Sequence, residues 1–524
     1  MNQEKENTGI SLLDKGRKGI TSAIFSRFGL ILLLLIIQVV FLFCIFRWFE
    51  EWVPHIYGGG IVLTVGMMLI VFNSPADPSA KLTWLAIILL LPVFGGLLYL
   101  YTQLDIGHRT LKARVNQLTA EAGHKLLQDP HVVQDLEKEN PGVAALAQYI
   151  NRNGCYPVYN NSDVTYFPQG EDKFQELLIQ LEKAEHFIFL EYFIVREGLM
   201  WGQVLEILAR KVKAGVDVRV MYDGTCEFAA LPRDYPQKLK KLGIKCKAFA
   251  PLSPFVSTHY NYRDHRKILV IDGHTAFTGG VNLADEYINH ITRFGHWKDT
   301  AVMVQGEAVQ SFTLMFLQMW SIDEKKPQYF PYINPPANTR KADGFVIPYG
   351  DCPLDYDKMG EQVYIDLLNR AHNYVHIMTP YLILDGETEN ALCFAAERGV
   401  DVRLILPGIP DKFLPYALAL THYGTLLAAG VKIYEYTPGF VHAKSFVVDD
   451  REAVVGTINL DYRSLYHHFE CATYMYGSAC IPDIEKDFQK TRAKCRRVTP
   501  DTIRQEKLSR KLLGFLIKPL APLL

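Results

Sequence analysis

The stretch YRDHRKILVIDG, residues 262–273, places histidine, arginine and lysine at the start of an apolar run of the kind that forms a buried strand. The same pattern returns as FVHAKSFVVDD, residues 440–450, and in both copies an aspartate follows the lysine after four intervening residues. A single charge pair at a strand end is usually solvated and structural, but a pair repeated with the same spacing indicates a shared function. The candidate catalytic residues are His265, Lys267, Asp272, His442, Lys444 and Asp449.

The repeat extends into the surrounding sequence. AGVDVRVMYDG, residues 214–224, is answered by RGVDVRLILPG, residues 398–408, and LGIKCKAFAP, residues 242–251, by AGVKIYEYTP, residues 429–438. These β-rich runs alternate with helical patterns, which is typical of β-α-β units. We therefore predict an α/β fold of two lobes related by a pseudo-twofold axis, each with a mixed, mainly parallel sheet flanked by helices.

The chain divides into five predicted regions. A segment with a Pro-Pro pair and no apolar periodicity, residues 334–341, is the expected linker between the two copies. The regions are residues 1–108 (membrane region), 109–145 (helical connector), 146–333 (first lobe), 334–500 (second lobe) and 501–524 (amphipathic C-terminal segment).

Side chains two residues apart on a strand share a face, so each motif histidine should point at the same ligand as its lysine. Asp272 and Asp449 lie an odd number of residues from the histidines, and we expect them to support the motif rather than to react. One imidazole can attack phosphorus to give a phosphohistidine, while the other protonates the leaving alkoxide and deprotonates the incoming nucleophile. Each lobe is thus predicted to supply half of a phosphoryl-transfer site that uses no metal or other cofactor.

A further pair of matching segments follows the aspartates, GGVN at residues 279–282 and GTIN at residues 456–459. Lysine ammonium groups, asparagine amides and backbone N–H groups near glycines are suited to binding the non-bridging oxygens of a phosphodiester. The candidate phosphate-binding residues are Asn282, Asn459, Gly280 and Thr457.

A nucleophilic imidazole also needs an acceptor for its second nitrogen. HWKDTAVMVQG, residues 296–306, places Asp299 where HHFECATYMYG, residues 467–477, places Glu470. We expect Asp299 to orient His265 and Glu470 to orient His442. The alternative is that both are ordinary acids at strand ends.

Three apolar segments precede the repeat. Residues 28–46 and 84–101 are each close to the about 20 residues that a helix needs to cross hydrocarbon, and residues 56–72 form a shorter, glycine-rich candidate. Basic residues before the first segment and after the third both predict a cytoplasmic flank, which three complete crossings cannot satisfy. Either one segment, with 56–72 the weakest, does not cross fully, or one flank violates the rule. We predict a multi-pass protein of the cell membrane.

The net charge and the cysteines of the chain indicate which partners it binds and on which side of the membrane its active site lies. The formal net charge of −1 gives no general electrostatic footprint for nucleic acid, which is therefore not an expected partner. The nine cysteines are scattered and contain no CxxC pair, which favours reduced thiols over a disulfide framework or a metal site. We therefore expect the active site on the cytoplasmic side of the membrane.

At these residues the sequence resembles the phospholipase D superfamily, in which the H-x-K-x(4)-D motif is doubled and followed by Gly and Asn. Within it, YRDHRKILVIDG, GGVNLADEY, WKDT and GTINLDYRS are similar to bacterial cardiolipin synthases. The resemblance covers nearly the whole chain, with the first apolar segment as an extra relative to the commoner two-span pattern. It implies that the phosphatidyl group of one phosphatidylglycerol passes to a second one without metal or nucleotide, giving cardiolipin and glycerol. It also implies that His265 is the nucleophile and His442 the general acid/base.

Other functions stay open. Water or serine as acceptor would make a phospholipase D or a phosphatidylserine synthase, and a nuclease of the same superfamily would act on nucleic acid. A membrane scaffold with an inactive site is the alternative outside enzymes, although both histidines are present. Acyl-chain preference and homo-oligomer formation are left open.

The C-terminal segment EKLSRKLLGFLIKPLAPLL, residues 506–524, interleaves basic and apolar residues at roughly helical spacing. Two interpretations are equally compatible with this pattern. It forms either an interfacial helix on a membrane or an amphipathic helix packed on the protein's own core.

Overall fold

The computed structural model describes residues 36–40, 53–103, 106–123, 125–251, 262–327, 329, 332–333, 342–355 and 357–523. The chain divides into two compact units. An N-terminal unit ends at Thr110, and a larger unit contains residues 111–251 and 262–522. The expected linker, residues 334–341, lies outside the described residues.

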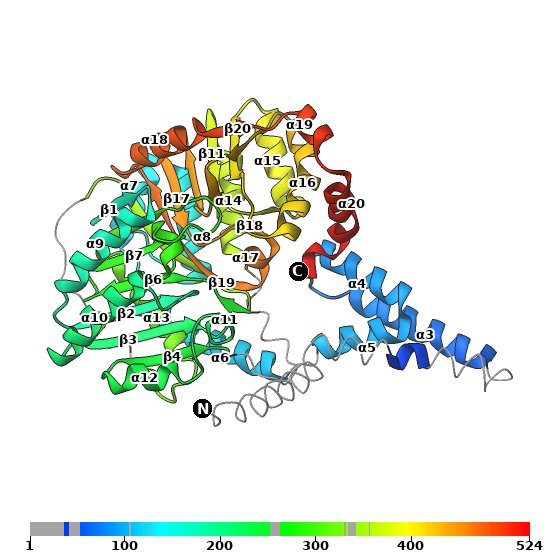
Figure 1. Cartoon of the computed structure of the whole chain (residues 1–524), viewed down its shortest axis with the longest axis horizontal. Coiled ribbons are helices and arrows are strands. Elements are labelled where there is room, and N and C mark those ends of the chain that lie inside the picture. Colours follow the sequence, from blue (N-terminus) through cyan, green and yellow to red (C-terminus); the bar gives the residue numbers. More distant parts are fainter. Residues whose placement is uncertain are drawn as a thin grey trace, which may run out of the picture. The chain divides into compact units, whose positions relative to one another are not determined.

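The apolar sequence of the N-terminal unit forms three consecutive helices, α3 (Val53–Phe72), α4 (Pro78–Leu90) and α5 (Pro92–Gln103) (Figure 1). The predicted continuous helix over residues 84–101 is wrong, because the chain leaves the helical conformation at Leu91, with φ −136° and ψ 71°. A residue before proline is disfavoured in the helical region, whereas proline itself readily begins a helix, so Pro92 starts α5.

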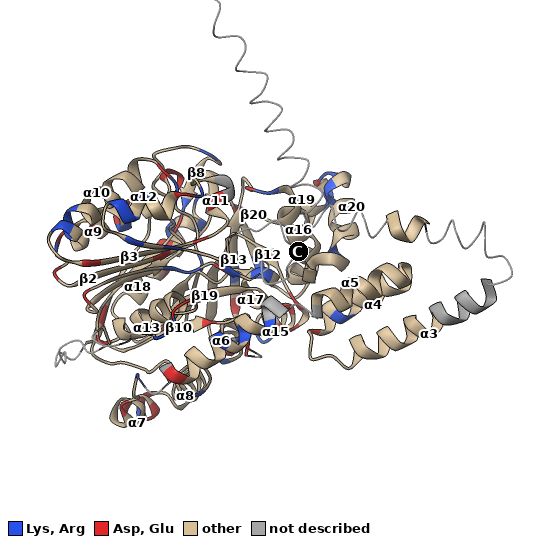
Figure 2. Cartoon of the chain, turned by 90° about the horizontal axis from the view of Figure 1, so that it is seen from below, with Lys and Arg blue, Asp and Glu red and all other residues tan. Residues whose placement is uncertain are grey.

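These helices expose apolar side chains and few charges. Figure 2 shows α3 and α5 almost without charged residues. Val62, Phe72 and Leu90 are 73%, 69% and 79% exposed. Within the described ranges, no helix is both long enough and apolar enough to span a membrane. The first predicted span, residues 28–46, lies outside the described residues except for a short helical piece at 36–40.

Three further helices lead into the first lobe: α6 (Ile106–Ala122), α7 (Pro130–Glu139) and α8 (Pro141–Gly154). The last two each begin with a side-chain cap followed by proline. Asp129 accepts a hydrogen bond from the His131 N–H at 2.8 Å, and Asn140 accepts one from the Gly142 N–H at 3.0 Å.

The first lobe is a seven-stranded sheet in the order β1-β9-β7-β6-β2-β3-β4. Its strands are β1 (Ser162–Phe167), β2 (Phe187–Tyr192), β3 (Asp217–Asp223), β4 (Lys245–Phe249), β6 (Lys267–Ile271), β7 (Thr275–Gly279) and β9 (Ala301–Gly306). Its helices are α9 (Gly170–Glu182), α10 (Leu199–Lys213), α11 (Cys226–Ala229), α12 (Tyr235–Lys241), the 3-10 helix η2 (Asp285–Ile288) and α13 (Val309–Trp320).

The second lobe repeats this order as β10-β19-β17-β16-β11-β13-β14, with β20 added at the edge. Its strands are β10 (Phe345–Asp351), β11 (Tyr374–Met378), β13 (Asp401–Pro407), β14 (Lys432–Tyr436), β16 (Ser445–Val448), β17 (Glu452–Gly456), β19 (His468–Tyr476) and β20 (Cys495–Arg497), with a small separate pair β12 (Leu382–Ile383) and β18 (Leu460–Asp461). Its helices are α14 (Met359–Arg370), α15 (Gly386–Glu397), α16 (Phe413–Ala428), α17 (Tyr462–Tyr466), α18 (Ile481–Arg492), α19 (Pro500–Gln505), α20 (Leu508–Ile517) and the 3-10 helix η3 (Lys518–Leu523).

The predicted α/β fold with two matching lobes is confirmed, but the predicted mainly parallel pairing is wrong. Within the two strand orders given above, only β2, β3 and β4, and their counterparts β11, β13 and β14, pair in parallel. The other neighbouring strands in these orders pair antiparallel. For β6 with β7 and for β16 with β17, the tight turn after each motif strand requires this direction.

Alternate residues of the central strands pack on opposite faces of each sheet. On β2, Ile188 and Leu190 join the cluster that includes buried residues of α9 and α10, whereas Phe189 stacks on Phe316 of α13 at 4.6 Å between ring centroids. This second cluster continues into the other lobe, so the two sheets share one core.

Two short strands connect the lobes where the motifs lie. β5 (Arg263–Asp264) runs parallel to the start of β19, and β15 (Gly439–Val441) runs parallel to β8 (His296–Lys298). Each of these added strands comes directly before a motif histidine. The fold therefore brings the two halves of the candidate site together.

Candidate active site

The backbone of each motif histidine is bound to the opposite lobe. The His265 N–H donates to the Phe469 carbonyl at 2.9 Å, directly after β5 pairs with β19. In the other half, the His442 N–H donates to the Lys298 carbonyl at 2.7 Å, directly after β15 pairs with β8. Both imidazoles are 7% exposed.

The carboxylates that orient the histidines are exchanged between the lobes. Nδ1 of His265 lies 2.8 and 2.9 Å from the two carboxylate oxygens of Glu470, and Nδ1 of His442 lies 2.7 Å from Oδ2 of Asp299. The expected pairing of Asp299 with His265 and of Glu470 with His442 is therefore wrong. The physical reason is strand pairing: each carboxylate lies one residue beyond the carbonyl that binds the histidine N–H, so one strand supplies both contacts.

Burial keeps both imidazoles neutral. It lowers the pKa of His265 well below the ordinary value, against the opposite effect of Glu470, and it lowers the pKa of His442 to about 4. Burial also opposes ionisation of Glu470, but the contact with His265 holds the pKa of that carboxyl below its usual range. A neutral imidazole that donates from Nδ1 keeps a lone pair on Nε2, which is the nitrogen left for a substrate.

The two motif lysines are buried beside the histidines. Lys267 and Lys444 are each 1% exposed, and each Nζ donates to the carbonyl of the motif histidine two residues earlier, at 2.5 Å. Burial lowers the pKa of Lys267 to about 8 and that of Lys444 to about 7. The positive charge of this site is consequently sensitive to pH near neutrality.

Asp272 and Asp449 lie away from the imidazoles, in turns where their φ angles are 51° and 50°. The carboxylate of Asp272 accepts hydrogen bonds from the backbone N–H groups of residues 185–187, at 2.7 to 2.8 Å. The carboxylate of Asp449 binds residues 372–374 in the same way, at 2.7 to 2.9 Å. They fix the turn after each motif strand to the start of the neighbouring strand.

Gly280 and Thr457, two of the expected phosphate ligands, use their backbone N–H groups in hydrogen bonds within the protein. The Gly280 N–H donates to the Thr300 carbonyl at 3.0 Å, and the Thr457 N–H donates to the Cys471 carbonyl at 2.9 Å. Both N–H groups therefore already have a carbonyl partner, and binding of a phosphate by Gly280 or Thr457 stays a prediction. The Thr457 hydroxyl instead donates to Glu470.

The two motif asparagines differ from each other. Asn282 accepts a hydrogen bond from the Ile194 N–H at 2.9 Å and donates to the Tyr287 hydroxyl at 2.8 Å, so it positions Tyr287. Asn459 is 4% exposed, and its Oδ1 has no hydrogen-bond partner within the described part of the chain. Asn459 is thus the better placed of the two to bind a ligand.

Gly280 has a steric role. A Cβ atom at this position would lie 2.0 Å from Oδ1 of Asp299 and 2.9 Å from the His442 carbonyl. The absence of a side chain therefore permits the contact between Asp299 and His442.

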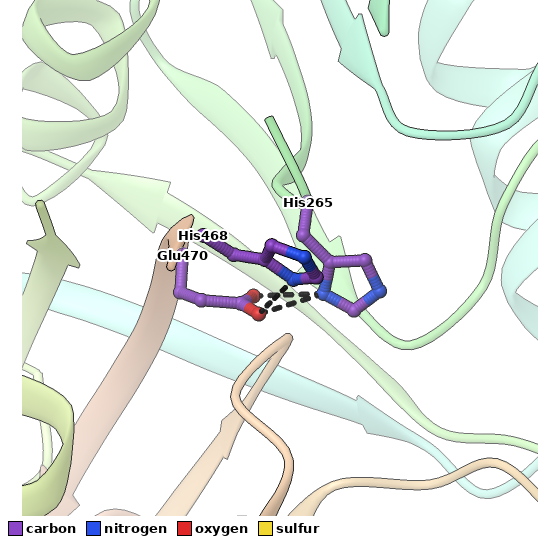
Figure 3. A group of neighbouring side chains, drawn as sticks. All are labelled: His265, His468 and Glu470. Atoms are coloured by element: carbon purple, nitrogen blue, oxygen red, sulfur yellow. Dashed lines mark hydrogen bonds and ion pairs between the residues drawn. The ribbon is translucent and has the colours of Figure 1, made fainter. Parts of the chain in front are cut away.

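Several residues beside the imidazoles were not predicted. His468 lies next to Glu470 and His265 (Figure 3), with its ring centroid 5.3 Å from that of His265. Trp297 occupies the matching position in the other half and is 5.4 Å from His442. The signal was present in the sequence, because HHFE and HWKD each place an aromatic ring two residues before the carboxylate.

Comparisons with known proteins identify the same regions. A family model described as cardiolipin synthase, PLD-like domain, matches residues 177–320 and 364–492, and a model described as phospholipase D-nuclease N-terminal matches residues 62–102. An uncharacterized protein of Streptococcus mutans is 58% identical over 460 residues, covering 88% of this chain and 100% of that protein. A cardiolipin synthase of Halalkalibacterium halodurans is 31% identical over 500 residues, covering 94% of this chain and 99% of that protein.

A solved structure supports the fold. The crystal structure of phosphatidylserine synthase from Haemophilus influenzae has a TM-score of 0.56 and 16% identity, covering 72% of this chain and 97% of that one. Together, the doubled motif, the two-lobed fold and the family match over more than half of the sequence show that this chain belongs to the cardiolipin synthase family of the phospholipase D superfamily.

Proposed function

We propose that this protein is a cardiolipin synthase that transfers the phosphatidyl group of one phosphatidylglycerol to the terminal hydroxyl of another. The products are cardiolipin and glycerol. The observation that supports this most directly is the pair of buried motif histidines, each held through Nδ1 by a carboxylate of the opposite lobe.

The first step forms a covalent intermediate. Nε2 of His265 attacks phosphorus, the bond from phosphorus to the glycerol oxygen breaks, and His442 gives a proton to the departing alkoxide. Lys267 and Lys444 stabilise the negative charge that gathers on the non-bridging oxygens. Protonated His442 must therefore form in the complex with the anionic substrate, because burial favours its neutral state.

In the second step His442 acts as a base, and His265 becomes the leaving group for the incoming acceptor. His442, now neutral, takes the proton of the acceptor hydroxyl, which attacks phosphorus and releases Nε2 of His265. Protons balance over the two steps, since the one given to glycerol is regained from the acceptor. The two steps need no metal ion or nucleotide.

We place the reaction at the surface of the cell membrane, where phosphatidylglycerol is found. The exposed apolar side chains of α3, α4 and α5 support this location. On α20, Leu508 is 79% exposed and Phe515 is 73% exposed, which favours the interfacial helix over a helix packed entirely on the core. The eight cysteines within the described residues are free thiols, which supports a cytoplasmic catalytic unit.

The test is a product assay with purified protein in detergent–phosphatidylglycerol micelles, without added metal or nucleotide. Cardiolipin and glycerol should appear together for the wild type and be lost in His265→Ala and His442→Ala. His467→Ala, outside the two half-sites, serves as the matched control and should retain turnover. Phosphatidic acid as the product would make water the acceptor, and no turnover of phospholipid by the wild type would contradict the proposal.

A further inference from the structure

Three side chains that can bind metal gather in the half of the site around His265 (Figure 3). His265, His468 and Glu470 each offer one nitrogen or oxygen, and these three atoms lie within 4.8 Å of one another. They are 7%, 8% and 0% exposed. The sequence did not predict this cluster, because β5 brings His265 from the first lobe to the strand of the second lobe that contains the other two.

His468 is the member that the proposed reaction does not use. Its Nδ1 lies 3.6 Å from Oε1 of Glu470, beyond hydrogen-bond distance, and neither of its ring nitrogens has a hydrogen-bond partner within the described part of the chain. Leaving a buried polar group without a partner costs free energy. A ligand that binds the ring would remove this cost.

The other half of the site lacks an equivalent group. Trp297 occupies the position that matches His468, and its Nε1–H donates to Oδ2 of Asp299 at 3.4 Å. An indole N–H can only donate and has no lone pair for a metal ion. The cluster is thus specific to the half that contains His265.

We propose that His265, His468 and Glu470 form a binding site for a divalent transition-metal ion of the zinc class, and that the bound ion inhibits the enzyme. Two imidazole nitrogens and one carboxylate oxygen are a ligand set that zinc accepts, with bonds of about 2.0–2.2 Å and a fourth position left to water. Lys267 does not occupy the cluster, since its Nζ is bound to the His265 carbonyl.

Binding requires the existing hydrogen bond to open. Nδ1 of His265 is now 2.8 Å from Glu470, so the ion would take the place of the Nδ1 proton between these two groups. The three ligand atoms lie within 4.8 Å of one another, whereas the ligands of a tetrahedral zinc ion are about 3.3–3.4 Å apart, so His468 would move toward the ion by roughly 1–1.5 Å.

Inhibition follows from the tautomer of His265, and this part rests on the proposed function. A neutral imidazole has one N–H and one lone pair. When the ion takes the lone pair of Nδ1, the proton moves to Nε2, and no lone pair remains there to attack phosphorus. No oxidant, reductant or other reactant is needed, and removal of the ion restores the nucleophile.

Binding is tested independently of activity. Protein purified without a histidine tag and stripped with a chelator is titrated with Zn²⁺ in competition with a chromophoric chelator. We expect one tight site in the wild type, with His468→Asn weaker by about 10- to 100-fold. His467→Asn, the neighbouring histidine outside the cluster, is the matched control and should bind as the wild type does. Equal affinity of His468→Asn and the wild type, or no stoichiometric site in the wild type, would overturn the proposed site.

Inhibition is tested in the product assay, with each variant compared with its own metal-free rate. Zn²⁺ should inhibit the wild type and His467→Asn, and the chelator should reverse this, while His468→Asn should resist at the same concentrations. Thermal unfolding establishes that each variant is folded. Tight binding without inhibition would overturn the inhibitory role alone. A wild type that turns over no phospholipid would contradict the proposed function, and the binding titration would still decide the site.

Discussion

At the scale of single residues, each imidazole depends on a carboxylate from the opposite lobe. The sequence identified all four residues, but it paired each histidine with the acid of its own copy. The correct pairs, His265 with Glu470 and His442 with Asp299, follow from inter-lobe strand pairing that a repeat in one sequence cannot show.

A substrate whose leaving group needs no proton can distinguish the role of the pair His265–Glu470 from that of the pair His442–Asp299. Glu470→Gln and Asp299→Asn should each lower kcat by about 10²–10⁴-fold, because an amide stabilises the wrong imidazole tautomer. With a p-nitrophenyl ester of phosphatidic acid, whose leaving group needs no proton, rapid-quench measurement should show that covalent-intermediate formation recovers in Asp299→Asn and stays slow in Glu470→Gln. The opposite pattern would contradict the combination of this pairing with His265 as the nucleophile.

The pH dependence of kcat/KM should reflect the deprotonation of the two buried motif lysines. Lys444 with a pKa of about 7 is charged below that pH and neutral above it, so activity should fall as pH rises through about 7. Arginine stays protonated, so Lys444→Arg should move this alkaline limb up to the pKa of Lys267, about 8. An alkaline limb that is unchanged in Lys444→Arg would argue against a titrating Lys444.

Gly280→Ala should disturb the contact between Asp299 and His442. The added methyl would overlap Oδ1 of Asp299, so we expect a loss of about 1–3 kcal/mol in the free energy of unfolding, with a fall in activity. Gly202→Ala on α10 is the matched control, because its Cβ would have no neighbour within 4 Å. Denaturant unfolding of both variants provides the comparison. Equal free energies of unfolding would show that the site accommodates the added methyl group without strain.

At the scale of elements, the sequence predicted the motif strands and most helix and strand alternations because their periodicity is local. The sequence-based prediction failed where an adjacent residue or a distant strand determines the conformation. Pro92 ends the expected helix over residues 84–101 at the preceding residue. Most neighbouring strands pair antiparallel, whereas the alternation of strands and helices led us to expect mainly parallel sheets. The cross-lobe strands β5 and β15 are too short to give a sequence signal.

Helix α20 makes a prediction about membrane binding. Leu512 and Phe515 are 55% and 73% exposed, so replacing both with glutamate removes apolar contact and adds charge repulsion at an anionic surface. Binding of the full chain to phosphatidylglycerol vesicles should weaken by at least about tenfold. Leu242→Glu, at another exposed leucine outside α20, should have little effect, and equal vesicle binding by the α20 variant and the control would show that α20 does not insert.

At the scale of the whole molecule, the doubled sequence predicted two lobes and one shared site. Both halves of that site lie in the same compact unit of one chain. Mixing purified His265→Ala with purified His442→Ala should therefore restore no cardiolipin synthesis. Recovery in the mixture, beyond a control that mixes either variant with the double variant, would mean that lobes are exchanged between copies.

The central claim is a covalent phosphatidyl–histidine intermediate on His265, formed within this inter-lobe site. The most direct measurement is to quench the His442→Ala variant after incubation with the p-nitrophenyl ester of phosphatidic acid labelled in the phosphatidyl moiety, because this leaving group needs no proton from His442. The adduct is then mapped by mass spectrometry of peptides kept at alkaline pH. The account predicts label on His265 and none in the double variant. Label on His442 in the reciprocal His265→Ala variant, with His265 unlabelled throughout, would contradict it.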